Sequence, residues 1–188
     1  MKAAHELFVE RDYDEVSTDE ILARSGVSRG AMYHHFPAKL DLFRAVYEAS
    51  EQRAIGLVAD ELATASDPFA ALLLGARAYL RLAETDRDLR RIGLTQSRAV
   101  LGWSGWREAA TGLGIGVVHA LVSSAIEAGQ MSRRDSETTA HVLLGALIEA
   151  AMLIVVAEDP AVARERSEAV VVDLIEGLRS QPGTVCSG

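Results

Sequence analysis

One short segment gathers side chains that could do chemistry. Residues 28–36 read SRGAMYHHF, which brings an arginine, a tyrosine and two adjacent histidines into about two helical turns. Such side chains could ligate a metal ion, move protons in a catalytic site, or donate hydrogen bonds to the phosphates and base edges of DNA. They could also form the polar, solvated face of an ordinary helix.

The spacing of the histidines argues against a metal centre. Adjacent residues on a helix point about 100° apart, so His34 and His35 do not bind one ion together. The segment His5–Val9 begins like a zinc-protease motif but has no second histidine, and Glu137 and His141 lack the spacing of a di-iron bundle. The chain also shows no set of nucleophile, base and orienting group. We therefore predict no metal, no cofactor and no enzymatic activity.

The distribution of charge favours a local anionic partner. The chain has 27 Asp and Glu residues against 19 Lys and Arg residues, and its formal net charge is -8. This balance argues against a protein that coats nucleic acid or an anionic membrane, because the averaged field repels phosphate. From Ile21 to Leu40, however, there is no acidic residue, whereas Arg24, Arg29 and Lys39 lie there with the two histidines. This window is a local basic patch.

Turn residues place the patch on a pair of short helices. Gly26 suits the left-handed residue that ends one helix, and Ser28 can cap the start of the next. On the second helix Met32 and Phe36 would face inward, so that Tyr33 points away from the core. A helix, a glycine-containing turn and a second helix form a helix-turn-helix pattern, whose N-terminal dipole and polar face can bind phosphates. A solvated polar face remains the alternative on this local reasoning.

The rest of the chain must position this pair, and its pattern is helical throughout. Proline occurs at only four positions, and the segments between them carry apolar residues at spacings of three and four. We predict an all-α fold of about nine helices. They are expected near residues 1–11, 18–25, 29–36, 39–65, 68–86, 88–101, 105–129, 135–158 and 161–180. The first three are short, and those after residue 39 are longer and more aliphatic.

The composition indicates a soluble, cytoplasmic protein. The start, MKAAHELFVERD, has no apolar signal-peptide core. The single cysteine, Cys186, excludes an intrachain disulfide and fits a reducing compartment. The longest apolar run, Val142–Ala157, contains Glu149 and is shorter than the roughly 20 residues that span a bilayer. We expect no membrane partner.

The segment from His5 to Tyr47 strongly resembles the N-terminal domain of the tetracycline-repressor (TetR) family of transcriptional regulators. The resemblance is continuous and rests on Leu7-Phe8, Tyr13, Ser17-Thr18, Ile21, Gly26-Val27-Ser28, Gly30, Tyr33-His34-His35-Phe36, Lys39 and Leu42-Phe43. It implies a three-helix, helix-turn-helix DNA-binding domain at 1–47, followed by a helical ligand-binding and dimerisation domain at 48–180. We expect residues 181–188 to form a flexible tail.

The resemblance also implies which residues approach DNA. By position these are Thr18, Ser28, Arg29, Gly30, Ala31, Tyr33, His34, His35 and Lys39. Thr18 and Lys39 correspond to phosphate contacts at the starts of their helices. Ala31 stands where the family more often has threonine, which removes one hydroxyl group. His35 either reaches the DNA backbone or packs between helices.

The helix expected at 135–158 is apolar nearly all round, so it must be covered on two sides. One cover can be the chain's own core, and the second can be the same helix of a partner subunit across a two-fold axis. We predict a homodimer whose interface contains Leu143, Leu147, Ala150, Ile154, Val171, Ile175 and Leu178. A central helix in a monomeric bundle is the alternative.

Polar residues in apolar surroundings of the larger unit are candidates for a ligand pocket. They are Tyr79, Gln96, Arg98, Trp103, Trp106, Arg107, His119, Ser123, His141, Glu149 and Met152. Trp103 and Trp106 could wall a pocket, while His119, His141 or Glu149 could orient a polar group within it. Each could instead be satisfied within the core or at a subunit interface.

Together these features predict a homodimeric regulator that binds double-stranded operator DNA. The resemblance implies a repressor that leaves its operator when a small-molecule effector binds the larger domain. A ligand-dependent activator is the nearer alternative, and an all-helical carrier or enzyme is the more distant one.

Overall fold

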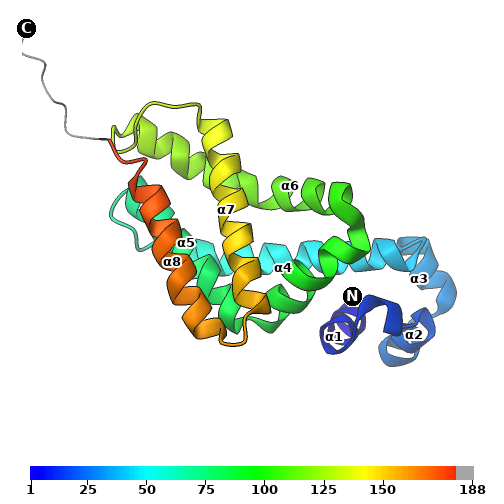
Figure 1. The fold of residues 1–188 in the computed structure, drawn as a ribbon. Helices are drawn as coiled ribbons and strands as arrows, with labels where there is room; N and C mark the ends of the chain where they lie inside the picture. The colour runs from blue at the N-terminus through cyan, green and yellow to red at the C-terminus, as the bar shows by residue number, and fades with distance from the viewer. Residues whose placement is uncertain (181–188) are drawn as a thin grey trace, which may run out of the picture.

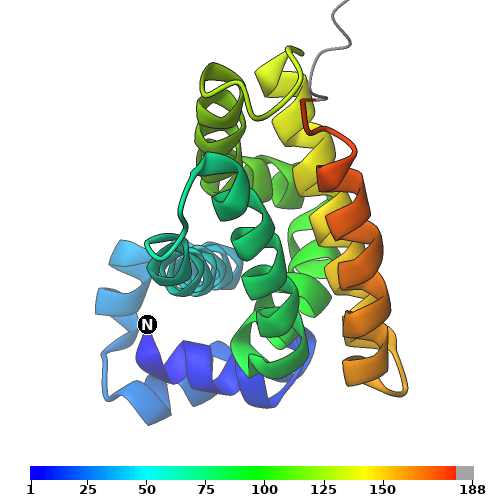
Figure 2. The same cartoon turned by 90° about the vertical axis from the view of Figure 1, so that its left-hand side faces the viewer.

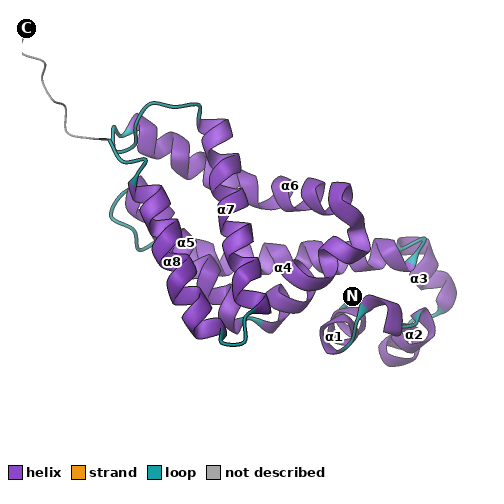
Figure 3. Cartoon of the chain, viewed as in Figure 1, coloured by secondary structure: helices purple, strands orange, loops and turns teal. Residues whose placement is uncertain are grey.

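The computed structural model describes residues 1–180, without the side chains of residues 111 and 113. In that range the chain is helical apart from turns and one isolated bridge between Met131 and Arg179 (Figure 3). The elements are α1 (Lys2–Glu10), η1 (Tyr13–Glu15), α2 (Thr18–Ser25), α3 (Arg29–His35), α4 (Lys39–Leu62), α5 (Pro68–Thr85), η2 (Leu89–Gln96), α6 (Ser97–Glu127), α7 (Ser136–Val156) and α8 (Pro160–Glu176). The predicted all-α fold is confirmed. The tail predicted at 181–188, with Cys186, lies outside the described residues.

The two helices predicted at 88–101 and 105–129 form one kinked element. The π-helical segment η2 runs directly into α6, and Gly102 interrupts α6 with φ 67° and ψ 170°. This backbone conformation is essentially restricted to glycine. The break predicted between residues 101 and 105 is therefore present, and it lies within α6.

A small apolar cluster holds the N-terminal helices together. The rings of Phe8 and Phe43 lie 5.2 Å apart, centroid to centroid, and those of Tyr13 and Phe43 lie 5.3 Å apart. Met32 of α3 is buried in the same cluster, and Ile92 of η2 joins it from the larger unit. In Figure 1 these helices occupy one end of the molecule, beside the first turns of α4. Met32 therefore anchors α3 as its spacing predicted.

The second and larger core lies between α5, α6, α7 and α8. Figures 1 and 2 show α7 and α8 side by side along one side of the molecule, and α7 also packs against α5 and α6. The side of α7 that faces this core carries Leu143, Leu147, Ala150 and Ile154. From α5, Phe69 and Leu80 are fully buried within the same core.

The core corrects the predicted dimer interface. Six of the seven residues assigned to it are buried within the single chain; they are Leu143, Leu147, Ala150, Ile154, Val171 and Ile175. The seventh, Leu178, is partly buried and packs against the core. The prediction is wrong for the six buried residues, because both α7 and α8 carry apolar side chains on more than one side. For Leu178, which is partly buried, it stays a prediction. The sequence pattern does not show which side meets the chain's own core.

The opposite side of α7 and the adjoining side of α8 expose several large apolar side chains beside the exposed Glu149 of α7. On α7, Val142 is 65% exposed, Leu153 is 55% exposed and Val156 is 72% exposed. On α8, Val170 and Leu174 are also exposed. We call these five residues the α7–α8 face.

Two helical segments are long and apolar enough to cross a membrane by length and composition, Leu89–Glu127 and Ser136–Val156. Both are longer than the apolar run identified in the sequence. Within α7, however, one side lies in the chain's own core, and Glu149 is exposed on the other. A charged group in the middle of a bilayer is costly.

Candidate DNA-binding surface and ligand cavity

Local capping defines the pair of helices that carries the basic patch. Ser17 Oγ accepts a hydrogen bond from Glu20 N at 3.2 Å, and the Glu20 carboxylate accepts one from Ser17 N at 2.9 Å. The backbone N–H of Ser17 and the side chain of Arg11 lower the pKa of Glu20 to about 2. Gly26 ends α2 in the left-handed conformation, with φ 68°. Because glycine adopts this conformation without strain, the turn between α2 and α3 is tight.

The start of α3 is capped in the same manner. Ser28 Oγ accepts a hydrogen bond from Ala31 N at 3.3 Å, which satisfies one of the free N–H groups of the first turn. The caps predicted from the sequence at Gly26 and Ser28 are therefore confirmed. They fix where α3 begins and which side of it faces outward.

Most of the predicted DNA contacts are exposed residues of α3 or of its N-cap, Ser28. Seven of the nine are exposed, namely Ser28, Arg29, Gly30, Ala31, Tyr33, His34 and His35. The other two, Thr18 and Lys39, are partly buried. The rings of His34 and His35 lie 5.3 Å apart in an edge-to-face arrangement. Contact with DNA remains a prediction for all nine residues.

Two cations of this surface already have protein partners. Arg29 forms an ion pair with Asp19 on α2, and both side chains are exposed. Lys39 Nζ donates to the carbonyl oxygen of Tyr13 and lies 3.9 Å from the centroid of the Tyr13 ring. Burial lowers the pKa of Lys39. Lys39 therefore ties the start of α4 to η1.

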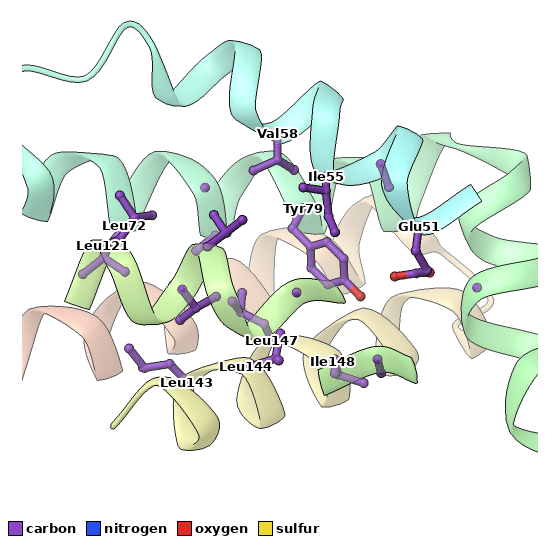
Figure 4. Close-up of a pocket in the computed structure, with 18 of the residues that line it drawn as sticks. Glu51, Ile55, Val58, Leu72, Tyr79, Leu121, Leu143, Leu144, Leu147 and Ile148 are labelled. Atoms are coloured by element: carbon purple, nitrogen blue, oxygen red, sulfur yellow. The ribbon is translucent and has the colours of Figure 1, made fainter. Parts of the chain in front are cut away.

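A cavity lies inside the larger unit, between α4, α5, η2, α6, α7 and α8 (Figure 4). Its volume is about 110 Å³, counted as the space that the centre of a water-sized molecule can occupy. Its walls are mainly aliphatic, with Ile55 and Val58 from α4 and Leu144 and Leu147 from α7. A cavity with such walls suits an apolar ligand.

Polar groups gather at one end of this cavity. Figure 4 shows the carboxyl group of Glu51 there, with the hydroxyl group of Tyr79 directed toward the same end. Burial raises the pKa of Glu51 to about 7 and also raises the pKa values of Tyr47 and Tyr79. A Cβ atom at Gly93 would lie 2.5 Å from Glu51 Oε1, so the glycine leaves space for the carboxyl group.

Most of the predicted ligand residues line a second cavity. Its lining includes Arg98, Trp103, Trp106, Arg107, His141 and Glu149. The guanidinium carbon of Arg98 lies 4.3 Å from the centroid of the Trp106 ring, and the two tryptophan rings are 5.5 Å apart. Trp106 also lines the first cavity. Of the eleven predicted residues, Tyr79 and Trp106 therefore reach the first cavity.

Four predicted ligand residues have other positions and line neither cavity; they are Gln96, His119, Ser123 and Met152. Gln96 Nε2 donates to the carbonyl oxygen of Phe8 at 2.7 Å, which ties α1 to the end of η2. His119 bonds to Ser136 and Ser123, and Met152 packs partly buried against the main core. These four residues do not line either cavity, and ligand contact stays a prediction for them.

The residue that the sequence prediction missed is Glu51. It lies four residues after Tyr47 and four before Ile55, on the side of α4 that continues with Val58. This side carries apolar residues at helical spacing. An acidic residue among them is unusual and could have been noticed in the sequence. Only the fold shows that this side faces a cavity.

Comparison with known proteins finds similarity along most of the chain. Residues 1–46 match the model for bacterial regulatory proteins of the tetR family, and residues 69–178 match that for a tetracyclin repressor-like C-terminal domain. The Transposon Tn10 TetC protein of Escherichia coli is 30% identical over 148 residues, which cover 77% of this chain and 73% of TetC. The transcriptional activator FasR of Mycolicibacterium smegmatis is 36% identical over 90 residues, which cover 48% of this chain and 41% of FasR.

The fold has a similar counterpart among solved structures. The crystal structure of a TetR-family transcriptional regulator from Pectobacterium atrosepticum superposes with a TM-score of 0.84 and 30% sequence identity. The match covers 97% of this chain and 93% of that protein. The similarity therefore extends over both the small N-terminal unit and the larger helical unit.

Proposed function

Since the chain belongs to the TetR family of DNA-binding transcriptional regulators, we propose that it represses its target genes and leaves its operator when a small molecule fills the cavity. The observation that carries the proposal is the course of α4. This helix begins at Lys39 beside the proposed DNA-binding surface, and it lines the cavity with Tyr47, Glu51 and Ile55. A ligand that shifts α4 therefore also shifts α3.

The open side of α3 is the proposed reading surface. Arg29, Tyr33 and His34 are exposed there and can donate to phosphates or base edges in a major groove. Lys39 can hold the carbonyl group of Tyr13 and still contact a phosphate, because an ammonium group has three donors. The remaining predicted contacts, such as Thr18, lie around this surface and would fix its orientation.

The proposed active form is a homodimer, which is typical of the family. The α7–α8 face supports this form because it exposes five apolar side chains on two adjacent helices. An apolar face of this kind is stabilised when a second copy covers it across a two-fold axis. Two copies would then present two α3 helices to successive major grooves, about 34–36 Å apart. We propose the cytoplasm, where the DNA lies, as the location.

Release of the operator requires a difference in ligand affinity between two states. The effector must bind the arrangement of α4 that is incompetent for DNA more tightly than the competent one. Under the proposal, filling the cavity favours a position of α4 that changes the separation of the two α3 helices. Since coupling is reciprocal, operator DNA must weaken effector binding by the same factor.

The test uses fluorescence anisotropy with duplexes from the region upstream of the protein's own gene. We expect one duplex to bind more tightly than a scrambled duplex of equal length at moderate salt. Tyr33→Ala should weaken this binding by roughly tenfold, as expected for loss of one good contact. Trp103→Ala removes an exposed aromatic ring that is not among the predicted DNA contacts and should leave the affinity unchanged. Equal binding to all duplexes would contradict the proposal.

A ligand-dependent activator is the second candidate. FasR, which shares 36% identity with this chain over 90 residues, is a transcriptional activator. A reporter gene behind the bound duplex separates the two functions. Deleting the regulator raises reporter expression if the protein represses, and lowers it if the protein activates.

A further inference from the structure

Building on the proposed role of the cavity as the effector site, we propose that the effector is an apolar amine whose protonated nitrogen binds the carboxylate of Glu51. The proposal names the chemical class of the ligand and the residue that selects it. It rests on the environment of Glu51, the form of the cavity and the lack of a cation among the described residues that line it.

Glu51 is a largely buried acid without a protein partner. Its carboxylate makes no hydrogen bond and no ion pair with any residue that the structure describes, and no nearby charge offsets its burial. A buried carboxylate without a partner is costly, and proteins ordinarily pair it or remove it. The pair that is missing within the chain can come from a ligand.

The walls of the cavity offer no cation to Glu51. Among the described residues that line it there is no lysine, arginine or histidine, and Glu51 is the only acid. Tyr47 and Tyr79 are neutral because burial raises the pKa values of their hydroxyl groups. A protonated amine supplies the opposite charge and N–H donors together. An alcohol supplies only one donor, and a carboxylate would be repelled.

The rest of the cavity fits the apolar part of such a ligand. In Figure 4 the side chains of Leu72 and Leu121 lie at the end away from Glu51, and Leu147 lies between the two ends. Apolar surface buried against such residues contributes favourably to binding in proportion to its area. The cavity therefore combines one charged end with an aliphatic remainder.

The raised pKa of Glu51 agrees with this assignment. Its value of about 7 means that burial in the apolar cavity disfavours the charged form near neutral pH. An ammonium group beside the carboxylate favours the charged form and lowers that pKa again. A cationic ligand is therefore expected to bind more tightly than a neutral one of the same size.

Calorimetry with three probes of equal chain length tests the proposal: octylamine, octanol and octanoate. Each is titrated into the full-length protein without DNA, at concentrations below micelle formation. We expect octylamine to bind roughly tenfold or more tightly than either of the others, as for a charge-assisted contact. Glu51→Gln should weaken octylamine binding by a similar factor and leave octanol binding nearly unchanged.

Glu48→Gln is the matched control, because Glu48 lies one turn earlier on α4 and is exposed. It removes the same charge outside the cavity and should leave all three affinities unchanged. Gly93→Ala is a second variant that displaces the Glu51 carboxyl group while keeping its charge, and it should also weaken octylamine binding. Circular dichroism is used to check that each variant is folded.

The proposal is overturned if octylamine shows no preference over octanol, or if Glu51→Gln leaves octylamine affinity unchanged. Release of labelled operator DNA is measured separately. If the amine binds through Glu51 without releasing DNA, the ligand class stands and the proposed release mechanism fails. If DNA binds specifically but the amine is not preferred, the regulator stands and the ligand class fails.

Discussion

Glu51 places a carboxyl group among aliphatic side chains, and its titration should be visible in the stability of the whole protein. Its pKa rises from an ordinary value of 4.5 in the unfolded chain to about 7 in the folded chain. Between these values the folded protein holds a proton that the unfolded chain releases. The free energy of unfolding therefore falls as pH rises through this range.

This effect predicts the behaviour of Glu51→Gln. Near pH 4.5 the variant and the unmodified protein should have similar free energies of unfolding. At pH 8 the variant should be more stable by up to roughly 2 to 3 kcal/mol, because glutamine avoids the burial of a charge. Denaturant unfolding at a series of pH values measures the difference. Tyr47 and Tyr79 stay neutral throughout this range, since burial raises the pKa of each.

Glu48→Gln serves as the control for this series, because the Glu48 carboxylate is exposed and keeps its contact with water on folding. A constant difference between the unmodified protein and Glu51→Gln at all pH values would contradict the prediction. Such a result would mean that the carboxyl group is hydrated in the folded protein. The same result would weaken the case for Glu51 as an unpaired ligand group.

At the scale of elements, η2 links the cavity to the DNA-binding unit. Gly93 of η2 lies against Glu51 at the cavity, while Arg91 of η2 forms an ion pair with Asp12 at 2.9 Å. Gln96 donates to the carbonyl oxygen of Phe8 at 2.7 Å. Helix α1 ends at Glu10, so this carbonyl has no partner within its own helix. The Gln96 side chain therefore completes the C-terminal end of α1.

Gln96→Met should accordingly destabilise the protein by roughly 1 to 3 kcal/mol, because it leaves the buried carbonyl of Phe8 without a donor. Methionine has a similar volume, so packing changes little. Thermal unfolding provides the measurement. Gln52→Met, at an exposed position of α4, is the matched control and should change stability by less than about 0.5 kcal/mol. Equal effects of the two variants would show that the Gln96 bond contributes nothing specific.

The elements themselves could be predicted from local signals. Gly26 and Ser28 mark the turn before α3 through backbone and capping chemistry, and both signals lie within a few residues of the structure they determine. The cavity could not be predicted in this way, because Glu51 and Leu147 are far apart in the sequence and meet only in the fold. Gln96 showed the same limit, since its partner Phe8 belongs to the first helix.

At the scale of the whole molecule, the apolar pattern of α7 was correctly identified but assigned to the wrong side. Both sides of this helix carry aliphatic residues at the same spacing, and periodicity does not distinguish a core side from an interface side. Packing distinguishes them, since Leu147 lies in the core and Leu153 is exposed. The corrected assignment changes which substitution should separate the proposed subunits.

Leu153→Glu should convert the proposed dimer to monomers. The substitution places a charge on the α7–α8 face, and a two-fold axis would bring two such charges into one desolvated interface. Leu147→Glu should instead unfold the chain, because it buries an unpaired charge in the core. Sedimentation velocity measures the mass in solution, and circular dichroism distinguishes a folded monomer from an unfolded chain.

Leu57→Glu provides the control, since Leu57 is an exposed leucine on α4, away from the α7–α8 face. This variant should sediment as a dimer. The monomeric Leu153→Glu protein should also lose most of its operator affinity, because one subunit engages only one half-site and gives up the gain of binding two linked sites. A folded Leu153→Glu protein that still sediments as a dimer would place the subunit contact elsewhere on the surface. The exposed leucines and valines of α7 and α8 would then require another partner.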